Sequence, residues 1–238
     1  MSREIIWKGN LHTNSSSRER NVPFVIVNHI SAGTMDSMDS WFTSEGNEVS
    51  SAHFGVAKDG RIHQYVDIGR MAWANGIGAA DIAASKTPVI VDNPGINPNL
   101  YSVSIEHEGT DGELTPVQFA ASVWLHKFIQ QQIYEIWGKQ FELGRYNVIG
   151  HFMVSKGKPQ CPGPKFPWDL LYSALEEEAD TMGFTDVPAT HWAIDSIKTV
   201  ADAGLMKGYP DGTFKPDQQI TRAEFAKVIN DLLYLIQN

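Results

Sequence analysis

One cysteine and two histidines supply the residue types of a metal site. Cys161 is the single cysteine of the 238 residues, so an internal disulfide is excluded, and the thiol is free, a nucleophile or a metal ligand. His29 follows an apolar run, and His151 lies ten positions before Cys161. Two imidazoles and one thiolate would leave zinc a fourth position for water, whose pKa the metal lowers to about 7. The same spacing also fits histidines that serve in a core or at a surface.

Strand and helix patterns alternate around these residues. Short β-branched or alternating runs predict strands at residues 22–30, 52–57, 61–66 and 102–108. The middle two flank Asp59-Gly60, which favours the positive φ of a hairpin turn. Thr115 and Gln118 form a capping box, and the helix that they open is predicted to end at Gly138. With shorter helices expected at 79–84 and 168–179, the alternation predicts an α/β fold, a central mixed β-sheet flanked by helices.

The composition changes near Glu176. Residues 176–238 hold 11 acidic and 5 basic residues, whereas residues 1–175 hold 17 and 14. A helix pattern covers residues 191–203, and Thr221 and Glu224 form a second capping box that opens a last helix. We therefore expect three parts, which are a domain at 1–175, a linker at 176–183 and a small all-α module at 184–238.

Charge and hydropathy exclude some classes of function. The formal net charge of −9 argues against a protein that binds nucleic acid by neutralising phosphates. No apolar run approaches the roughly 18 residues of a membrane span. The first seven residues lack the apolar core of a secretory signal peptide. We expect a protein with no nucleic-acid partner, no membrane span and no signal peptide.

Six short motifs occur in the order typical of one enzyme family. They are Val25-Ile-Val-Asn-His29, Ser51-Ala-His-Phe-Gly-Val56, Asp59-Gly-Arg-Ile-His-Gln64, Ala72-Trp-Ala-Asn-Gly76, Val103-Ser-Ile-Glu106 and Gly150-His151 with Cys161-Pro-Gly163. Over about residues 20–175 the chain resembles the zinc-dependent N-acetylmuramoyl-L-alanine amidases of the phage-endolysin and peptidoglycan-recognition type. The resemblance implies Zn²⁺ held by His29, His151 and Cys161. It also implies hydrolysis of the amide between N-acetylmuramic acid and L-alanine in peptidoglycan.

The resemblance also suggests the general base, which in this family is a Tyr or a Glu. Ala52 stands where the Tyr would be, so Glu106 is the expected base. Strand alternation puts Ser104 and Glu106 on one face and His107 on the other. A carboxylate near the metal can take a proton from water and pass it to the leaving amine.

Other site residues are expected around this centre. Many relatives have an oxyanion-stabilising Lys where this chain has Pro159, so Lys158 is the nearest candidate, with an ordinary loop lysine as the alternative. His53, Trp73 and Asn75 are expected to contact the substrate, although Trp73 also fits a packing role. His63 and His107 fit surface positions on strands equally well, and His126 has no supporting pattern.

Residues 184–238 resemble one S-layer homology repeat. The motifs are Phe184-Thr-Asp-Val-Pro188, Gly208-Tyr-Pro-Asp-Gly-Thr-Phe214 and Ile220-Thr-Arg-Ala-Glu224. The resemblance implies binding of secondary cell-wall polysaccharide, with Trp192 and Arg222 at the matching positions, because an indole packs on a sugar and a guanidinium pairs with a carboxylate. Since such repeats usually come in threes, a single copy implies self-association, weak binding or a vestigial repeat, and we expect a homo-oligomer.

Together these features predict a zinc-dependent peptidoglycan hydrolase, targeted to the cell wall, of the endolysin or autolysin kind. The alternatives are a non-catalytic peptidoglycan-binding protein on the same scaffold and a structural S-layer component. The presence of Cys161 favours the enzyme, because relatives that only bind have usually lost this ligand. Without a signal peptide, release through a holin-type membrane lesion is expected, with cytoplasmic wall recycling as the alternative.

Overall fold

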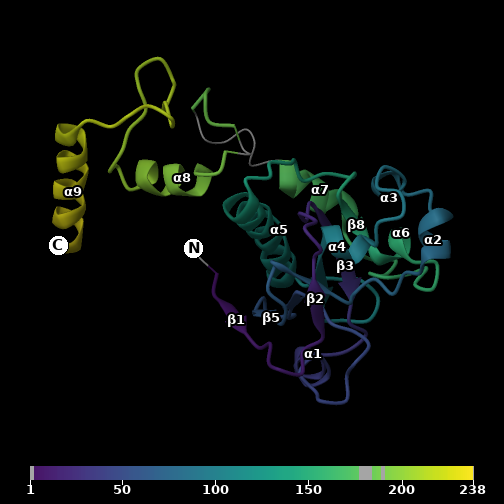
Figure 1. Ribbon diagram of the computed structural model, residues 1–238. Coiled ribbons are helices and arrows are strands. Elements are labelled where there is room, and N and C mark those ends of the chain that lie inside the picture. Colours follow the sequence, from purple (N-terminus) through teal and green to yellow (C-terminus); the bar gives the residue numbers. More distant parts are fainter. Residues whose placement is uncertain (1–2, 177–183, 189–190, 238) are drawn as a thin grey trace. The chain divides into compact units, whose positions relative to one another are not determined.

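The structure, a computed structural model, describes residues 3–176, 184–188 and 191–237. The chain divides into two compact units, Met1–Glu176 and Glu177–Asn238 (Figure 1). Among the residues that the structure describes, no helix combines the length and the apolar character that crossing a membrane requires.

The first unit is built on a six-stranded mixed sheet. Its strands lie in the order β1 (Ile5–Trp7), β5 (Ile62–Gln64), β4 (Phe54–Val56), β7 (Ser102–His107), β3 (Val25–Ile30) and β8 (Val148–Gly150). Only β4 and β5 are antiparallel, and they form the predicted hairpin, in which Gly60 has φ 86°. The other neighbours are parallel. A separate antiparallel ribbon joins β2 (Ser15–Ser17) and β6 (Arg70–Ala72). The predicted α/β fold with a central mixed sheet is confirmed.

The register of the three parallel strands β7, β3 and β8 brings chemistry to one end of the sheet. His29 on β3 lies opposite Glu106 on β7, and Asn28 lies opposite Gly150, the last residue of β8. Helix α6 (His151–Val154) starts directly after Gly150. Because parallel strands end at the same edge, His29, Glu106 and His151 share one neighbourhood.

The long helix α5 (Pro116–Trp137) covers one face of this sheet (Figure 1). It begins with the predicted Thr115–Gln118 capping box and ends at Gly138, whose φ of 66° suits glycine. Its apolar side packs on strand side chains, in a cluster that includes Ile26, Val103, Ile105, Leu125, Ile129 and Ile133. Burying each such side chain contributes about 1.5–3 kcal/mol, so this cluster fixes the strands that carry the site.

Shorter helices pack on the rest of the unit. They are α1 (Met35–Phe42), α2 (Ala79–Ala83), α3 (Pro88–Val91), α4 (Pro98–Tyr101) and α7 (Trp168–Glu176). Val25 and Val27, which face away from α5, pack against α3, α4 and α6. The strand predicted from residue 22 starts only at Val25, because Pro23 has no N–H to donate to a ladder. The helix predicted to residue 179 is described to Glu176, and 177–179 lie outside the described residues.

The second unit contains helices α8 (Ile194–Asp202) and α9 (Arg222–Gln237). The helix predicted from His191 begins three residues later, because the His191 ring accepts the Ala193 N–H at 3.2 Å and holds a turn there. The predicted second capping box is present: Thr221 Oγ1 accepts the Glu224 N–H, and Glu224 accepts the Thr221 N–H. This box fixes the start of α9.

Candidate metal centre

Three side chains with metal-binding atoms converge where β3 and β8 end. One ligand atom from each of His29, His151 and Cys161 lies within 4.8 Å of the other two. The Nδ1 atoms of the two histidines are 3.0 Å apart, and Cys161 Sγ accepts the Ile30 N–H at 3.4 Å. Both histidines are buried, and the cysteine is partly exposed. The predicted triad is therefore assembled by the fold.

Hydrogen bonding prepares His151 to bind a cation. His151 Nε2 donates to the Asn75 carbonyl at 2.8 Å, so its Nδ1 carries a lone pair directed at His29. Burial lowers the pKa of His29 well below its ordinary value and also lowers that of His151, which keeps both rings neutral. In tetrahedral zinc with Zn–N of about 2.0–2.1 Å, two ligand nitrogens lie about 3.3 Å apart, close to the distance found here. The nitrogen and sulfur donors thus fit Zn²⁺.

The thiol is protonated before any metal arrives. Burial raises the pKa of Cys161 to about 11, while the Ile30 N–H acts in the opposite direction. Since thiolate is the form that binds metal, loading the centre must release this proton.

Glu106 adds a proton-transfer group beside the triad. Its Oε1 lies 3.8 Å from His29 Nδ1, and its Oε2 is buried with no hydrogen-bond partner among the described residues. Burial raises the pKa of Glu106 to about 7, although the charge of Lys158 lowers it in part. A carboxyl group with a pKa near neutrality can both take up and release a proton during a reaction.

Lys158 lies in the loop after α6, with an exposed side chain. Its backbone N–H donates to the Ser155 carbonyl at 3.2 Å. Its positive charge affects the pKa values of Glu106, His29 and Cys161, so the ammonium lies within electrostatic reach of the centre.

Two predicted substrate residues, His53 and Asn75, are buried beneath the centre. Asn75 Nδ2 donates to Ser102 Oγ at 3.1 Å, and His53 Nδ1 lies 3.0 Å from Ser104 Oγ. Ser102, Ser104 and Glu106 alternate along the same face of β7, so these contacts support that face from below. In this structure neither side chain reaches the surface. By contrast, the side chain of Trp73 is exposed.

Sequence reasoning missed a ring of hydrogen bonds on the other face of the metal-binding strand. His107 Nδ1 donates to the His29 carbonyl at 2.9 Å, and His107 Nε2 accepts from Ser122 Oγ at 2.8 Å. His126 Nδ1 donates to the Ser122 carbonyl at 2.7 Å, and Asn28 Nδ2 donates to His126 Nε2 at 3.1 Å. All of these residues are buried. Ser122 and His126 are four residues apart on a predicted helix, and this spacing is the feature of the sequence that could have indicated these hydrogen bonds.

The surface positions considered for His63 and His107 are wrong. Both side chains are buried, and His63 Nδ1 bonds to Asp39 Oδ1 at 2.8 Å.

In the second unit, Trp192 and Arg222 are both exposed, and the Trp192 ring lies 6.0 Å from that of His191, centroid to centroid.

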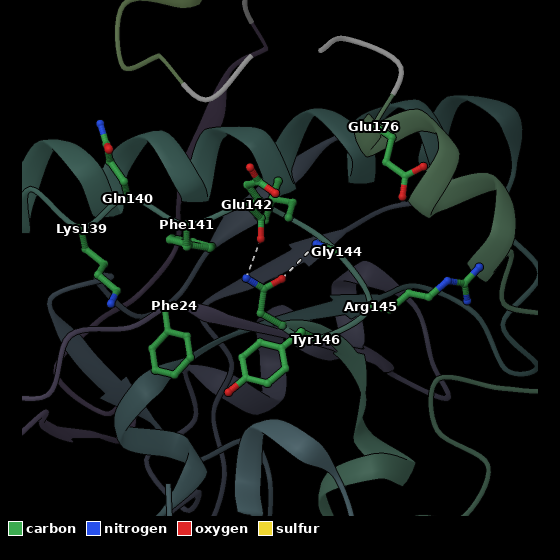
Figure 2. Close-up of a pocket in the computed structure, with 11 residues that line it drawn as sticks. Phe24, Lys139, Gln140, Phe141, Glu142, Gly144, Arg145, Tyr146 and Glu176 are labelled. Carbon is green, nitrogen blue, oxygen red and sulfur yellow. Dashed lines mark hydrogen bonds between the residues drawn. The ribbon is translucent and has the colours of Figure 1, made fainter. Parts of the chain in front are cut away.

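A separate hollow of about 530 Å³ lies beside the loop that joins α5 to β8 (Figure 2). Phe24, Lys139, Glu142 and Tyr146 are among its lining residues. Asn147 shapes the loop by accepting the Gly144 N–H at 3.0 Å and donating to the Glu142 carbonyl, the two bonds drawn as dashed lines in Figure 2. Phe24 precedes β3 and Asn147 precedes β8, so the hollow belongs to the strand ends away from the triad. None of the predicted site residues lines it.

The mixed sheet, the nitrogen and sulfur donors and the adjacent carboxyl together define a centre suited to metal-assisted hydrolysis. Comparison with known families makes this class specific. The model described as N-acetylmuramoyl-L-alanine amidase matches residues 18–164, and the S-layer homology domain model matches residues 183–226. The chain therefore belongs to the N-acetylmuramoyl-L-alanine amidase family and carries an S-layer homology domain. The predicted family and enzyme class are confirmed, and the pair of domains indicates association with the cell wall.

Solved structures share the fold. The crystal structure of an AmpD derivative matches with a TM-score of 0.54 and 21% identity, covering 74% of this chain and 96% of that one. The structure of PlyL matches with a TM-score of 0.50 and 18% identity, covering 74% of this chain and 97% of that one. At these identities the likeness concerns the fold alone.

Curated relatives match only a short segment. Cell surface glycoprotein 1 of Acetivibrio thermocellus is 63% identical over 46 residues, which are 19% of this chain and 2% of that protein. The cellulosome-anchoring protein of the same organism is 58% identical over 45 residues, 19% of this chain and 10% of that protein. The chain thus spans a small fraction of the length of the relatives that it matches.

Proposed function

We propose that the first unit hydrolyses the amide bond between N-acetylmuramic acid and L-alanine in peptidoglycan, and that it requires Zn²⁺ held by His29, His151 and Cys161. The observation that carries the proposal is the convergence of three metal donors within 4.8 Å, beside the largely buried carboxyl group of Glu106. Membership of the amidase family supports the choice of bond. Zinc at this position would polarise the amide carbonyl and acidify a water molecule.

The protein side chains handle the protons and the charge. Glu106 takes the proton from the attacking water and passes it to the departing L-alanine amine, which its pKa of about 7 allows. Lys158 stabilises the negative charge that develops on the carbonyl oxygen. His53 and Asn75 support the centre from below, and Trp73 contacts the substrate at the rim.

A turbidity assay on purified Gram-positive cell walls tests this function. We expect lysis that a strong chelator abolishes and zinc restores, with new amino-terminal alanine and no new reducing sugar. Cys161→Ala and Glu106→Gln should each lower the rate by at least about 100-fold. Glu113→Gln is the matched control, because Glu113 is an exposed carboxylate that pairs with Lys165. Lysis that persists in both site variants, or the release of reducing sugar, would contradict the proposal.

The same assay separates the enzyme from a non-catalytic binding protein. A protein that only binds would sediment with walls and release no amino-terminal alanine. The presence of all three donors and of the buried carboxyl favours the enzyme.

For the second unit, we propose that it binds secondary cell-wall polysaccharide through Trp192 and Arg222, and that it self-associates. Helix α9 exposes Phe225, Ile229 and Leu232, whose spacing of four and three residues matches a coiled-coil seam. A second copy of the helix would cover this seam. Light scattering at tens of micromolar tests it, and a strictly monomeric mass would exclude self-association. We also propose that the enzyme acts at the cell wall, which the combination of an amidase domain with an S-layer homology domain supports.

A further inference from the structure

Two exposed tryptophans lie on segments that hydrogen bonds connect to each other. The side chain of Trp41, on the last turn of α1, is 48% exposed, and that of Trp73, just after β6, is 39% exposed. We name the pair the tryptophan platform. Large exposed aromatic side chains that gather on one surface commonly mark a binding site.

Hydrogen bonds hold both indole rings in fixed orientations. Trp41 Nε1 donates to Ser50 Oγ at 2.9 Å, and Trp73 Nε1 donates to Ser16 Oγ at 3.1 Å. Each ring thus satisfies its single polar group within the protein while a large part of it stays open to solvent. A ring that is already oriented loses little conformational entropy when a ligand stacks on it.

The two tryptophans are connected through adjacent serines. Ser50 holds the Trp41 ring, whereas Ser51 exchanges two bonds with the Trp73 backbone: its Oγ accepts the Trp73 N–H at 2.9 Å and its N–H donates to the Trp73 carbonyl at 3.2 Å. The buried Asn47 fixes the intervening loop, since its side chain donates to the carbonyls of Trp41, at 3.0 Å, and Ser50, at 2.7 Å. The two segments that carry the rings are therefore held together by hydrogen bonds.

A short stretch of chain connects the platform to the metal centre. Asn75, two residues after Trp73, is the residue whose carbonyl orients His151. Two residues of extended chain span at most about 7 Å, so the Trp73 backbone lies close to the carbonyl that orients His151. Trp41 lies further along, beyond Ser50 and Ser51.

The chemistry of the platform favours a neutral sugar chain. Around Trp41, residues 41–51 contain Glu45 and Glu48 and no lysine or arginine, which disfavours an acidic stem peptide at that ring. The partly exposed hydroxyl groups of Ser16 and Ser50 lie against the rings. Indole faces pack on the apolar faces of sugars, while hydroxyls can bond to their polar edges.

We propose that the tryptophan platform is a binding subsite for the glycan strand of peptidoglycan, contacting N-acetylated sugars beyond the muramic acid whose amide is cleaved. The proposal rests on the proposed amidase function and extends it, because it makes the enzyme selective for polymeric glycan over single muramoyl peptides. The proposal assigns a role in substrate recognition to Trp41, a residue that belongs to none of the sequence motifs.

The test compares two substrates with the zinc-loaded full chain. One is N-acetylmuramoyl-L-alanyl-D-isoglutamine, which has one sugar, and the other is a purified peptidoglycan fragment of four disaccharides. We measure the ratio of kcat/KM on the long substrate to that on the short one. We expect Trp41→Ala to lower this ratio roughly three- to tenfold, mainly through KM on the long substrate. Trp41→Phe should restore part of it, because the phenyl ring keeps an aromatic face.

Tyr146→Ala is the matched control for losing an exposed aromatic ring. Tyr146 is 44% exposed and lies beside the hollow of Figure 2, so its loss should leave the ratio unchanged. If Trp41→Ala lowers kcat/KM equally on both substrates, or lowers it on neither, the subsite does not exist. A ratio that falls equally in Tyr146→Ala would also overturn the proposal.

Binding of a tetramer of N-acetylglucosamine, followed by tryptophan fluorescence, separates the subsite from the amidase activity. Weaker binding in Trp41→Ala than in the wild type supports the subsite even if neither substrate is hydrolysed, in which case the proposed activity alone fails. Hydrolysis of both substrates with tetramer binding equal in the wild type and Trp41→Ala overturns the subsite and leaves the activity standing.

Discussion

Stability of the first unit in mild acid depends on two histidines buried between β3, β7 and α5. Burial lowers the pKa of His107 to about 3 and that of His126 to about 4. In the unfolded chain a histidine titrates near 6.5. Below that pH these histidines bind protons in the unfolded state but stay neutral in the folded state. The free energy of unfolding therefore falls as the pH drops towards their pKa values in the folded state. The stabilisation is fully present above pH 6.5 and is lost below it.

The size of the effect follows from these values. For His126, a pKa near 4 in the folded state against 6.5 in the unfolded state implies a loss of about 2 kcal/mol between pH 7 and pH 5. His107 contributes about the same over this interval, since both folded pKa values lie below pH 5. Replacing His126 by Asn removes the titrating group but keeps an N–H that can donate to the Ser122 carbonyl in place of Nδ1. The wild type should therefore lose about 2 kcal/mol more than His126→Asn between pH 7 and pH 5.

Urea unfolding followed by tryptophan fluorescence measures this difference. Six of the seven tryptophans lie in the first unit, so the signal reports mainly on that unit. The measurement is made at pH 7, 6 and 5, with saturating zinc and again with a chelator, because metal binding has its own pH dependence. If the free energy of unfolding changes with pH by the same amount in the wild type and in His126→Asn, the reasoning is refuted, whatever the absolute difference between the two proteins.

Three further predictions concern the core and the metal centre. Leu125→Ala should lower the free energy of unfolding by about 2–5 kcal/mol in urea, because Leu125 is fully buried between α5 and the sheet. Gly163→Ala should weaken zinc binding at least about tenfold in competition with a chelating dye, since a Cβ there would lie 2.2 Å from backbone atoms and displace the loop of Cys161. Asn75→Ala keeps the backbone carbonyl that orients His151 but removes the side-chain bond to Ser102 that holds this segment in place, so zinc affinity should fall by about tenfold. Unchanged affinity would show that the Asn75 side chain does not position the carbonyl.

Local patterns account for the elements that were predicted. The β-branched run at β3, the Asp59-Gly60 turn and the Thr115–Gln118 box each act within a few residues, so the chain reveals them without tertiary information. The strands β1, β2 and β6 and the helices α1, α3 and α4 were not predicted. Most of these have three or four residues, too few to display a period.

The sequence by itself determined the family, the α/β class and the three candidate metal ligands, because ordered motifs and residue types are properties of the chain alone. Only the tertiary structure decided that His29, Glu106 and His151 meet at one end of parallel strands, and that His53, Asn75, His107 and His126 are buried around them. It also decided the raised pKa of Glu106. Burial, ring tautomers and pKa depend on which groups pack against a side chain, and residues far apart in the sequence supply those groups.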